Sequence, residues 1–351
     1  MRCSSALRPQ RPRHRAPRRG PREARVLLLT PLDPAPRPDT DLGAVTRDLL
    51  DSLKARGRWD VVHASITCLQ DVETALFEHQ PDVVFNACES VGGRSADEPE
   101  VPHLLERLGV PFTGSSSSCL RLCLDKFDTS SALARAGVPV PATYRAGVPL
   151  PASPFPLIVK PEREDGSVGI DADSVVHDAA SLSRKVAGLA ADGRPAVLQQ
   201  YIDGREVALA LLGGTNPRVL SPGEILYDAD AFSGRPRILT YASKWDETSV
   251  DYVGTRSTEA ALSPELHRHL SVLARRAAAA LGMRDYGRID FRVDRSGRAF
   301  VIDANPNCDL SRDGGFMLAA KRSGLDHGQV VATLVTGALA RAGAPARAAA
   351  R

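Results

Sequence analysis

The segment RIDFRVDRSGRAFVID, residues 288–303, constrains the fold most, because apolar and polar residues alternate on both sides of a turn sequence. Alternation with a period of two predicts strands that bury one face. The Ser-Gly pair between the two runs predicts a hairpin. A two-residue loop flanked by Arg295 and Arg298 sets the expected register. In that register Asp290 lies directly opposite Asp303.

Two carboxylates opposed on one face of a sheet repel each other, so the hairpin requires compensating positive charge. In the same register Arg288 faces Asn305. A divalent cation would supply the charge, because carboxylate and amide oxygens suit hard ions such as Mg²⁺. A solvated polar face, on which Arg288 and Arg292 neutralise the acids, explains the hairpin alone equally well.

Composition predicts a globular protein of two or three domains. The chain has 351 residues, and its hydrophobic share of 43% is typical of proteins with a packed core. No apolar run approaches the ~20 residues of a membrane helix, so no membrane association is expected. The net charge of +3 comes from residues 1–24, an Arg/Pro-rich stretch that we expect to be disordered.

The remainder of the chain is mildly acidic, which argues against a nucleic-acid partner. The six cysteines show no paired spacing, so neither a zinc site nor a disulfide framework is indicated. A reducing, cytoplasmic location fits this pattern.

The order of the predicted elements indicates an α/β fold. Residues 25–113 alternate strand and helix signals, which is typical of a parallel sheet. Residues 114–199 and 200–343 mix strands and helices in a different order. Within them, residues 195–214 read as two strands joined by a tight turn. Residues 344–351 read as a frayed tail.

Several common nucleotide-binding and hydrolase motifs are missing, among them GxxxxGK[ST], a strand-coupled GxGxxG, GxSxG and HExxH. Lysine usage is more informative: only six of the 45 basic residues are Lys, which suggests sites that need a compact ammonium. Lys160 ends an apolar strand beside a loop with Gly166 and Gly169, where backbone N–H groups could approach a phosphate. An ordinary surface turn also explains that loop. Lys126 and Lys244, taken alone, read as solvated lysines.

Taken in order, these segments resemble the ATP-grasp superfamily, and within it the D-alanine–D-alanine ligases and their relatives. The resemblance rests on TG…DK, VKP with its Gly/Ser loop, GRE, SKW and GRIDFRVD…FVIDANPN, and it covers roughly residues 25–340. It implies an N-terminal parallel α/β domain followed by two α+β subdomains that sandwich ATP. A catalytically silent nucleotide-binding member is the alternative, which the retained lysines and metal ligands disfavour.

The resemblance also implies roles for individual residues. Lys126 and Lys160 would contact the phosphates of ATP, Lys244 would reach the terminal phosphates, and the backbone at 200 and 202 would read the adenine edge. The implied nucleotide-binding residues are Lys126, Lys160, Gly166, Ser167, Gly169, Gln199, Gln200, Tyr201, Ile202, Glu206 and Lys244. The implied ligands of two Mg²⁺ or Mn²⁺ ions are Asp290, Asp303 and Asn305, and the implied catalytic residues are Arg288, Lys244 and Ser167.

The implied reaction joins two small molecules, a carboxylate and an amine, at the expense of ATP. The carboxylate attacks the γ-phosphate to give an acyl phosphate and ADP, while magnesium and lysine offset the developing charge. The amine then attacks the acyl phosphate, and Arg288 would stabilise the tetrahedral oxyanion. The resemblance implies an amino acid or small peptide as substrate, and a homodimer.

The chain departs from the D-alanine enzymes at three substrate-binding segments. Residues 86–93, NACESVGG, replace an HGxxGE-type segment, PLDPAPRPD replaces a Ser-containing acidic motif, and PNCDLSRDGG follows Asn305 in place of the usual D-alanine loop. Gln199 stands where an acid usually meets the adenine amino group, and its carbonyl oxygen can still accept that hydrogen bond. The predicted substrate-contacting residues, for which solvated loop positions are the alternative, are Glu89, Arg94, Ser311 and Arg312.

Overall fold

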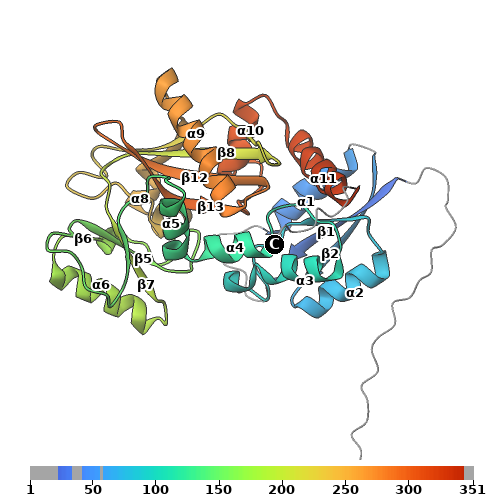
Figure 1. Cartoon of the computed structure of the whole chain (residues 1–351), viewed down its shortest axis with the longest axis horizontal. Helices are drawn as coiled ribbons and strands as arrows, with labels where there is room; N and C mark the ends of the chain where they lie inside the picture. The colour runs from blue at the N-terminus through green and yellow to red at the C-terminus, as the bar shows by residue number, and fades with distance from the viewer. Residues whose placement is uncertain (1–22, 34–41, 56–57, 344–351) are drawn as a thin grey trace, which may run out of the picture.

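The computed structural model describes residues 23–33, 42–55 and 58–343. The predicted tail and nearly all of the predicted N-terminal extension lie outside these ranges. Figure 1 shows the N-terminal region at one end of the molecule, beside the last helix, and the segment around α6 (Ala179–Ala191) at the other end. Within the described part of the chain, no helix is both long and apolar enough to cross a membrane.

The N-terminal region is a parallel sheet in the order β2-β1-β3, as predicted. Residues 26–29 of its central strand are all apolar because both faces are covered: Val26 and Leu28 join one core cluster, and Leu27 and Leu29 join another. The elements of this region are β1 (Ala24–Pro31), α1 (Leu42–Ala55), β2 (Trp59–Ile66), α2 (Leu69–His79), β3 (Val83–Asn86), η1 (Ser95–Asp97) and α3 (Glu100–Leu108).

A four-stranded antiparallel sheet follows, in the order β4-β7-β5-β6. Helix α6 packs on it through Leu189, and two further helices lead into it from the N-terminal region. The strands and short helices are α4 (Ser117–Leu124), α5 (Lys126–Arg135), β4 (Thr143–Arg145), β5 (Leu157–Pro161), η2 (Ala172–Ser174), β6 (Val175–Val176) and β7 (Ala196–Gln200).

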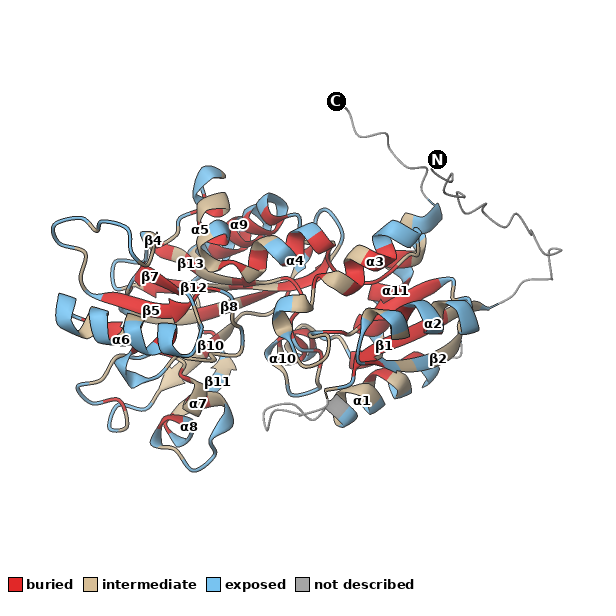
Figure 2. Ribbon diagram, turned by 90° about the horizontal axis from the view of Figure 1, so that it is seen from below, coloured by how far each residue is buried: buried red, intermediate tan, exposed pale blue. Residues whose placement is uncertain are grey.

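The third sheet has six strands, in the order β11-β10-β8-β12-β13 with β9 added to β8. Figure 2 shows that buried residues concentrate on the strands, whereas the outer faces of α2 and α6 are exposed. The strands of the third sheet and the helices of the same part of the chain are β8 (Gly204–Gly213), β9 (Arg218–Val219), β10 (Gly223–Tyr227), α7 (Tyr241–Trp245), α8 (Val250–Val253), β11 (Thr255–Glu259), α9 (Pro264–Leu281), β12 (Asp285–Asp294), β13 (Ala299–Asn305), α10 (Gly315–Arg322) and α11 (His327–Gly343).

Strands β7 and β8 do not form a hairpin, so that part of the sequence interpretation is wrong. Strand β7 pairs with β4 and β5, whereas β8 pairs with β10 and β12. Residues 201–203 carry the chain from one sheet to the other. Gly204, the first residue of β8, permits close packing rather than a turn. A Cβ at this position would lie 2.1 Å from the carbonyl oxygen of Val293.

Strands β12 and β13 form the predicted hairpin, but its loop is one residue longer than predicted. The N–H of Asp294 donates to the carbonyl oxygen of Arg298 at 2.9 Å. Gly297 has a φ of +83°, in the left-handed region that three-residue loops require of their glycine. The predicted two-residue loop is therefore wrong.

The predicted pairing of the two acids nevertheless holds. Next to the loop, Phe291 lies opposite Val301, one residue away from the predicted register. An irregularity between Asp290 and Phe291 absorbs the extra residue, as a β-bulge does. Beyond it, Asp290 lies opposite Asp303. The extra loop residue and the bulge, neither of which was predicted, therefore offset each other at Asp290 and Asp303.

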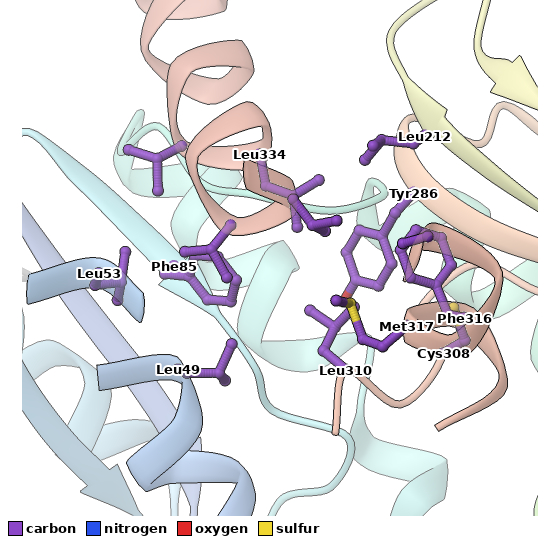
Figure 3. Packing of buried hydrophobic residues seen from close by; sticks show 14 of the residues in the cluster. Leu49, Leu53, Phe85, Leu212, Tyr286, Cys308, Leu310, Phe316, Met317 and Leu334 are labelled. Atoms are coloured by element: carbon purple, nitrogen blue, oxygen red, sulfur yellow. The ribbon is translucent and has the colours of Figure 1, made fainter. Parts of the chain in front are cut away.

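A hydrophobic cluster joins the N-terminal sheet to the C-terminal part of the chain. Figure 3 shows Leu49 and Phe85 from the N-terminal region on one side of Leu334 of α11, with Tyr286 and Phe316 on the other. The two aromatic rings meet edge to face with centroids 5.7 Å apart. Helix α11 therefore belongs to the cores of both parts.

A buried carboxylate at the start of β12 reinforces this junction. Asp285 is 2% exposed, and its φ of +65° lies in the left-handed region. The guanidinium of Arg341 on α11 binds both carboxylate oxygens, and the N–H of Gly114 donates to Oδ2 at 2.8 Å. One side chain thus connects the linker after the N-terminal sheet, the last helix and the third sheet.

Replacing Asp285 by Ala should lower the free energy of unfolding by about 3 kcal/mol, because Arg341 and the Gly114 N–H lose their acceptor. Urea denaturation at pH 7 measures the loss. Asp285→Asn is the matched control: it keeps an oxygen acceptor and a residue type that tolerates positive φ, so its loss should be smaller. Equal stability of the wild type and the Ala variant would contradict the role assigned to Asp285.

Candidate active site

The predicted site residues gather where the four-stranded sheet faces the hairpin of the six-stranded sheet. Lys160 on β5 donates to Oε1 of Gln199 at 3.0 Å and approaches the carbonyl oxygen of Ile302 on β13 at 3.5 Å. Gln199 also lines a pocket, together with Lys126 on α5 and with Ile302 and Asp303 on β13. The pocket encloses about 240 Å³ of empty space, its open mouth included.

The opposed acids of the hairpin are surrounded by positive charge. Arg288 binds Asp290 with both arms, Nε to Oδ1 at 2.7 Å and Nη2 to Oδ2 at 2.8 Å. Burial disfavours the ionised form of Asp303, yet Lys126, Lys160 and Arg288 hold its pKa below the ordinary value. The repulsion expected from the hairpin alone is thereby offset.

Lys160 and Lys244 are ammonium groups placed in a poorly hydrated environment. Burial lowers the pKa of Lys160 to about 8, against which the nearby carboxylate of Asp303 acts in the opposite direction. Burial and the charge of Arg288 lower the pKa of Lys244 as well. A desolvated cation interacts strongly with an anion that enters the pocket.

The donor set of the hairpin fits a hard divalent cation that a phosphate completes. In the described residues, no group of three or more His, Cys, Asp or Glu side chains could hold a metal. Two carboxylates, Asp290 and Asp303, and the amide oxygen of Asn305 are too few ligands for an all-protein site. Mg²⁺ is commonly held by one or two carboxylates together with phosphate oxygens and waters, and this set fits that pattern.

The glycine loop, residues 163–169, is closed onto the segment that carries Lys244. The hydroxyl of Ser167 donates to the carbonyl oxygen of Leu239 at 2.8 Å, and Nε1 of Trp245 donates to that of Gly166 at 3.0 Å. Ser167 itself has a φ of +64°, a strained conformation for a residue with a side chain. The glycine loop is thus tethered to α7 and to the residue before its N-cap.

Lys126 also contacts the glycine loop. Its Nζ donates to the carbonyl oxygen of Glu164 and lies 3.8 Å from Oδ1 of Asp165. Gly169 has a φ of +73°, and a Cβ there would lie 2.7 Å from Cγ of Pro161. Glycine is therefore required at this end of the loop.

The residues predicted to read the base and ribose lie at the crossing between the two sheets. Gln199 is buried, and the N–H of Gln200 donates to the carbonyl oxygen of Ala142 at 2.7 Å. Glu206 on β8 accepts from the Tyr227 hydroxyl at 2.8 Å through Oε2. Three further placements complete this group: Arg292 donates to the same oxygen of Glu206 at 2.7 Å, Arg292 lies 6.0 Å from the ring centroid of Tyr201, and Ile202 is buried.

Two acids of the N-terminal region carry raised pKa values. Burial first, and then the charges of Asp309 and Asp165, raise the pKa of Glu89 to about 8. The side chain of Glu89 is exposed. Burial also raises the pKa of Glu98 well above its ordinary value.

The other predicted substrate residues are engaged with neighbours. Arg94 is largely exposed and lies 3.1 Å from Asp97. The hydroxyl of Ser311 donates to Asp309 within its own loop. Arg312 donates to Asp48 on α1 at 2.6 Å. Among the described contacts of Arg94 and Arg312, none joins the cluster formed by the lysines and the hairpin.

Three residues near the pocket were not anticipated: Glu98, Asp165 and Asn307. The amide of Asn307 donates to Glu98 and to the carbonyl oxygen of Cys88 at 3.2 Å. Glu98 lies in a run of acids that reads as solvated, and no local pattern distinguishes it. Its burial arises only when the turn after β13 packs against the N-terminal region.

The fold is that of known ligases. The crystal structure of D-alanine–D-alanine ligase from Bacillus anthracis complexed with ATP superposes with a TM-score of 0.70, covering 91% of this chain and 98% of that chain at 17% identity. The predicted fold, an N-terminal parallel sheet followed by two antiparallel sheets of the ATP-grasp type, is confirmed.

Sequence comparison identifies the family. Residues 151–336, more than half of the chain, match the family model described as D-ala D-ala ligase C-terminus. The chain is 32% identical to "Uncharacterized protein y4sG" of Sinorhizobium fredii over 71% of this chain and 72% of that protein. It is 29% identical to the D-alanine–D-alanine ligase of Desulforudis audaxviator over 82% of this chain and 90% of that protein.

Fold and sequence together define an ATP-grasp enzyme, a ligase, as the resemblance implied. The chain belongs to the D-alanine–D-alanine ligase family.

Replacing Lys160 by Met tests the desolvated ammonium. The pKa of Lys160 is about 8 in the folded protein and has an ordinary value of 10.5, so the unfolded chain binds more protons between these pH values. The wild type should therefore gain stability relative to the variant as the pH rises from 8 to 10, by about 2 kcal/mol. Urea denaturation of both proteins at several pH values measures this difference. If the difference in free energy of unfolding between the two proteins stays constant over this pH range, the lowered pKa of Lys160 is contradicted.

Proposed function

We propose that the protein is an ATP-dependent carboxylate–amine ligase that forms an amide or peptide bond through an acyl phosphate and releases ADP and phosphate. The observation that carries the proposal is the convergence of Lys126, Lys160 and Lys244 on the paired acids Asp290 and Asp303. No single segment of the chain contains this arrangement, and a pocket lined by Lys126 and Asp303 lies beside it.

ATP would lie between the two antiparallel sheets, with its base at the crossing segment and its phosphates toward the lysines. The buried side chain of Gln199 and the carbonyl of Gln200 would face the adenine, and Glu206 would accept from the ribose. Two facts support this orientation. The second oxygen of Glu206 has no hydrogen bond among its described contacts, and Lys160 already extends from β5 toward the hairpin.

Asp290, Asp303 and Asn305 would hold magnesium together with the phosphates. The ion would neutralise charge on the transferring group, as in other phosphoryl-transfer enzymes. Arg288 now binds Asp290 with both arms, so a cation that takes over this carboxylate would free the guanidinium. The freed arms would then face the acyl centre and stabilise the oxyanion that forms during amine attack.

The closed glycine loop would exclude water from the acyl phosphate, which hydrolysis would otherwise destroy. Its tethers support this role: Ser167 and Gly166 are bound to residues on either side of Lys244 in the chain. Lys126 would neutralise phosphate charge from the opposite side. Each residue thus binds, orients or excludes water, and the chemistry is that of ATP and the two substrates.

The substrates are proposed to be a carboxylate and an amine of the size of an amino acid or small peptide. Glu89, whose side chain is exposed and lies near the acids Asp309 and Asp165, is the best-placed residue to contact an amine. Ser311 lies in the loop beside it, and Arg94 and Arg312 stay as weaker candidates. The replaced D-alanine segments favour a substrate pair that differs from two D-alanines.

The division of the chain into residues 25–113, 114–199 and 200–343 is a further proposal, supported by the three separate sheets. The expected homodimer likewise stays a prediction.

Purified protein with ATP and Mg²⁺ should release phosphate when a suitable amino acid is added. A panel of amino acids and dipeptides, tested singly and in pairs, identifies the substrates from phosphate release and from the mass of the product. Nucleotide binding without substrate-dependent phosphate release across the panel would favour a silent nucleotide-binding protein.

Asp303→Asn should reduce kcat at least about 100-fold while leaving the fold intact, because the amide lacks the charge that holds the cation. Asp173→Asn, at an exposed acid in η2, is the matched control and should retain wild-type activity. Steady-state phosphate release at saturating Mg²⁺ measures both. An Asp303→Asn enzyme as active as the control would rule out the metal assignment.

A further inference from the structure

The side-chain amide of Asn307 is buried where the hairpin meets the N-terminal region, and all of its polar atoms have partners. Oδ1 accepts from the hydroxyl of Tyr286. Nδ2 donates to the carbonyl oxygen of Cys88 at 3.2 Å and to Oε1 of Glu98. These partners fix the orientation of the amide, because a flipped amide would set its oxygen against two acceptors.

The backbone of Asn307 faces the candidate metal site. Its N–H donates to Oδ1 of Asn305 at 2.9 Å. An amide oxygen has two lone pairs, so Asn305 can accept this bond and still offer the second pair to a cation. Outer partners of this kind orient a ligand and tune its affinity.

We infer that Asn307 is a positioning residue of the ligase. Its side chain fixes the turn after β13 against Glu98, and the fixed turn holds the N–H that orients Asn305 toward the cation. The inference rests on the proposed function, since it takes Asn305 as a metal ligand. Through Asn307, a residue of the N-terminal region and a ligand of the metal site share one hydrogen-bond network.

Asn307→Asp tests this role because it replaces the donor by an acceptor and adds a negative charge without changing the shape of the side chain. The carboxylate keeps the shape, the backbone N–H and an acceptor for Tyr286, but it turns an oxygen toward Glu98 and Cys88. Added negative charge beside a cation site should strengthen metal binding if charge alone mattered. Positioning predicts the opposite: about 10-fold weaker binding of Mn²⁺.

The measurement is an electron paramagnetic resonance titration with Mn²⁺ and an ATP analogue that has a methylene bridge between its β- and γ-phosphates, so no turnover is needed. Asn216→Asp on the exposed turn between β8 and β9 is the matched control. It loses the same amide and gains the same charge, and it should bind Mn²⁺ like the wild type.

A reversed pair supplies the second arm. Combining Asn307→Asp with Glu98→Gln exchanges donor and acceptor, so that the amide at 98 donates to the carboxylate at 307. This double variant should recover most of the lost Mn²⁺ affinity. Single-variant affinity within two-fold of wild type, or a loss that the reversed pair does not reduce, overturns the inference.

If Asn307→Asp does not fold, Tyr286→Phe decides instead. It removes only the hydroxyl that binds Oδ1 of Asn307, and it should weaken Mn²⁺ binding several-fold; unchanged affinity overturns the inference. Failure of the proposed function is distinguishable, because the wild type would then show no substrate-dependent phosphate release, whatever the Mn²⁺ affinities of the variants.

Discussion

The site depends on one electrostatic constraint: two carboxylates, Asp290 and Asp303, face each other across a hairpin and cannot be left uncompensated. The chain answers with fixed cations from separate elements, which are Arg288 on the same strand, Lys160 on the opposing sheet and Lys126 on the intervening helix. The two sheets are therefore held face to face by attraction between their charges as well as by the chain that connects them. A polyanion with its counter-ion would enter a site whose charges are already arranged.

Local patterns predicted most elements but not always their partners. The alternating strand and helix signals of residues 25–113 reappear as a parallel sheet with its helices, because each burial pattern is repeated along a single element. The hairpin shows the limit of such reasoning. Its acids pair as expected only because a longer loop at Gly297 and a bulge beyond Asp290 offset each other, and sequence periodicity carries no signal for a bulge. The lysines and acids were predictable from family motifs, whereas Glu98 and Asn307 needed the packed structure.

The N-terminal region contains two of the three segments at which the sequence departs from the motifs of the D-alanine enzymes. Glu89 and Glu98 carry raised pKa values for the same reason, burial, but their settings differ. Glu98 is held by the amide of Asn307, whereas the side chain of Glu89 is exposed. Within one region the protein thus provides an acid that is fixed in place and another that is open to a ligand. This difference is where the choice of substrate is expected to be encoded.

The crossing from β7 to β8 has a mechanical consequence. The four-stranded sheet is entered just before Thr143 on β4 and left after Gln200 on β7, and these two strands are neighbours, paired at Thr143 and Gln199. The two covalent connections between this sheet and the rest of the chain therefore lie side by side and together define a hinge line. A rotation of this sheet about that line would displace residues near the hinge least and the distant glycine loop most. A nucleotide base bound at residues 201–203 would lie close to the rotation axis. The phosphates of the nucleotide would lie beneath the glycine loop, which the rotation displaces most.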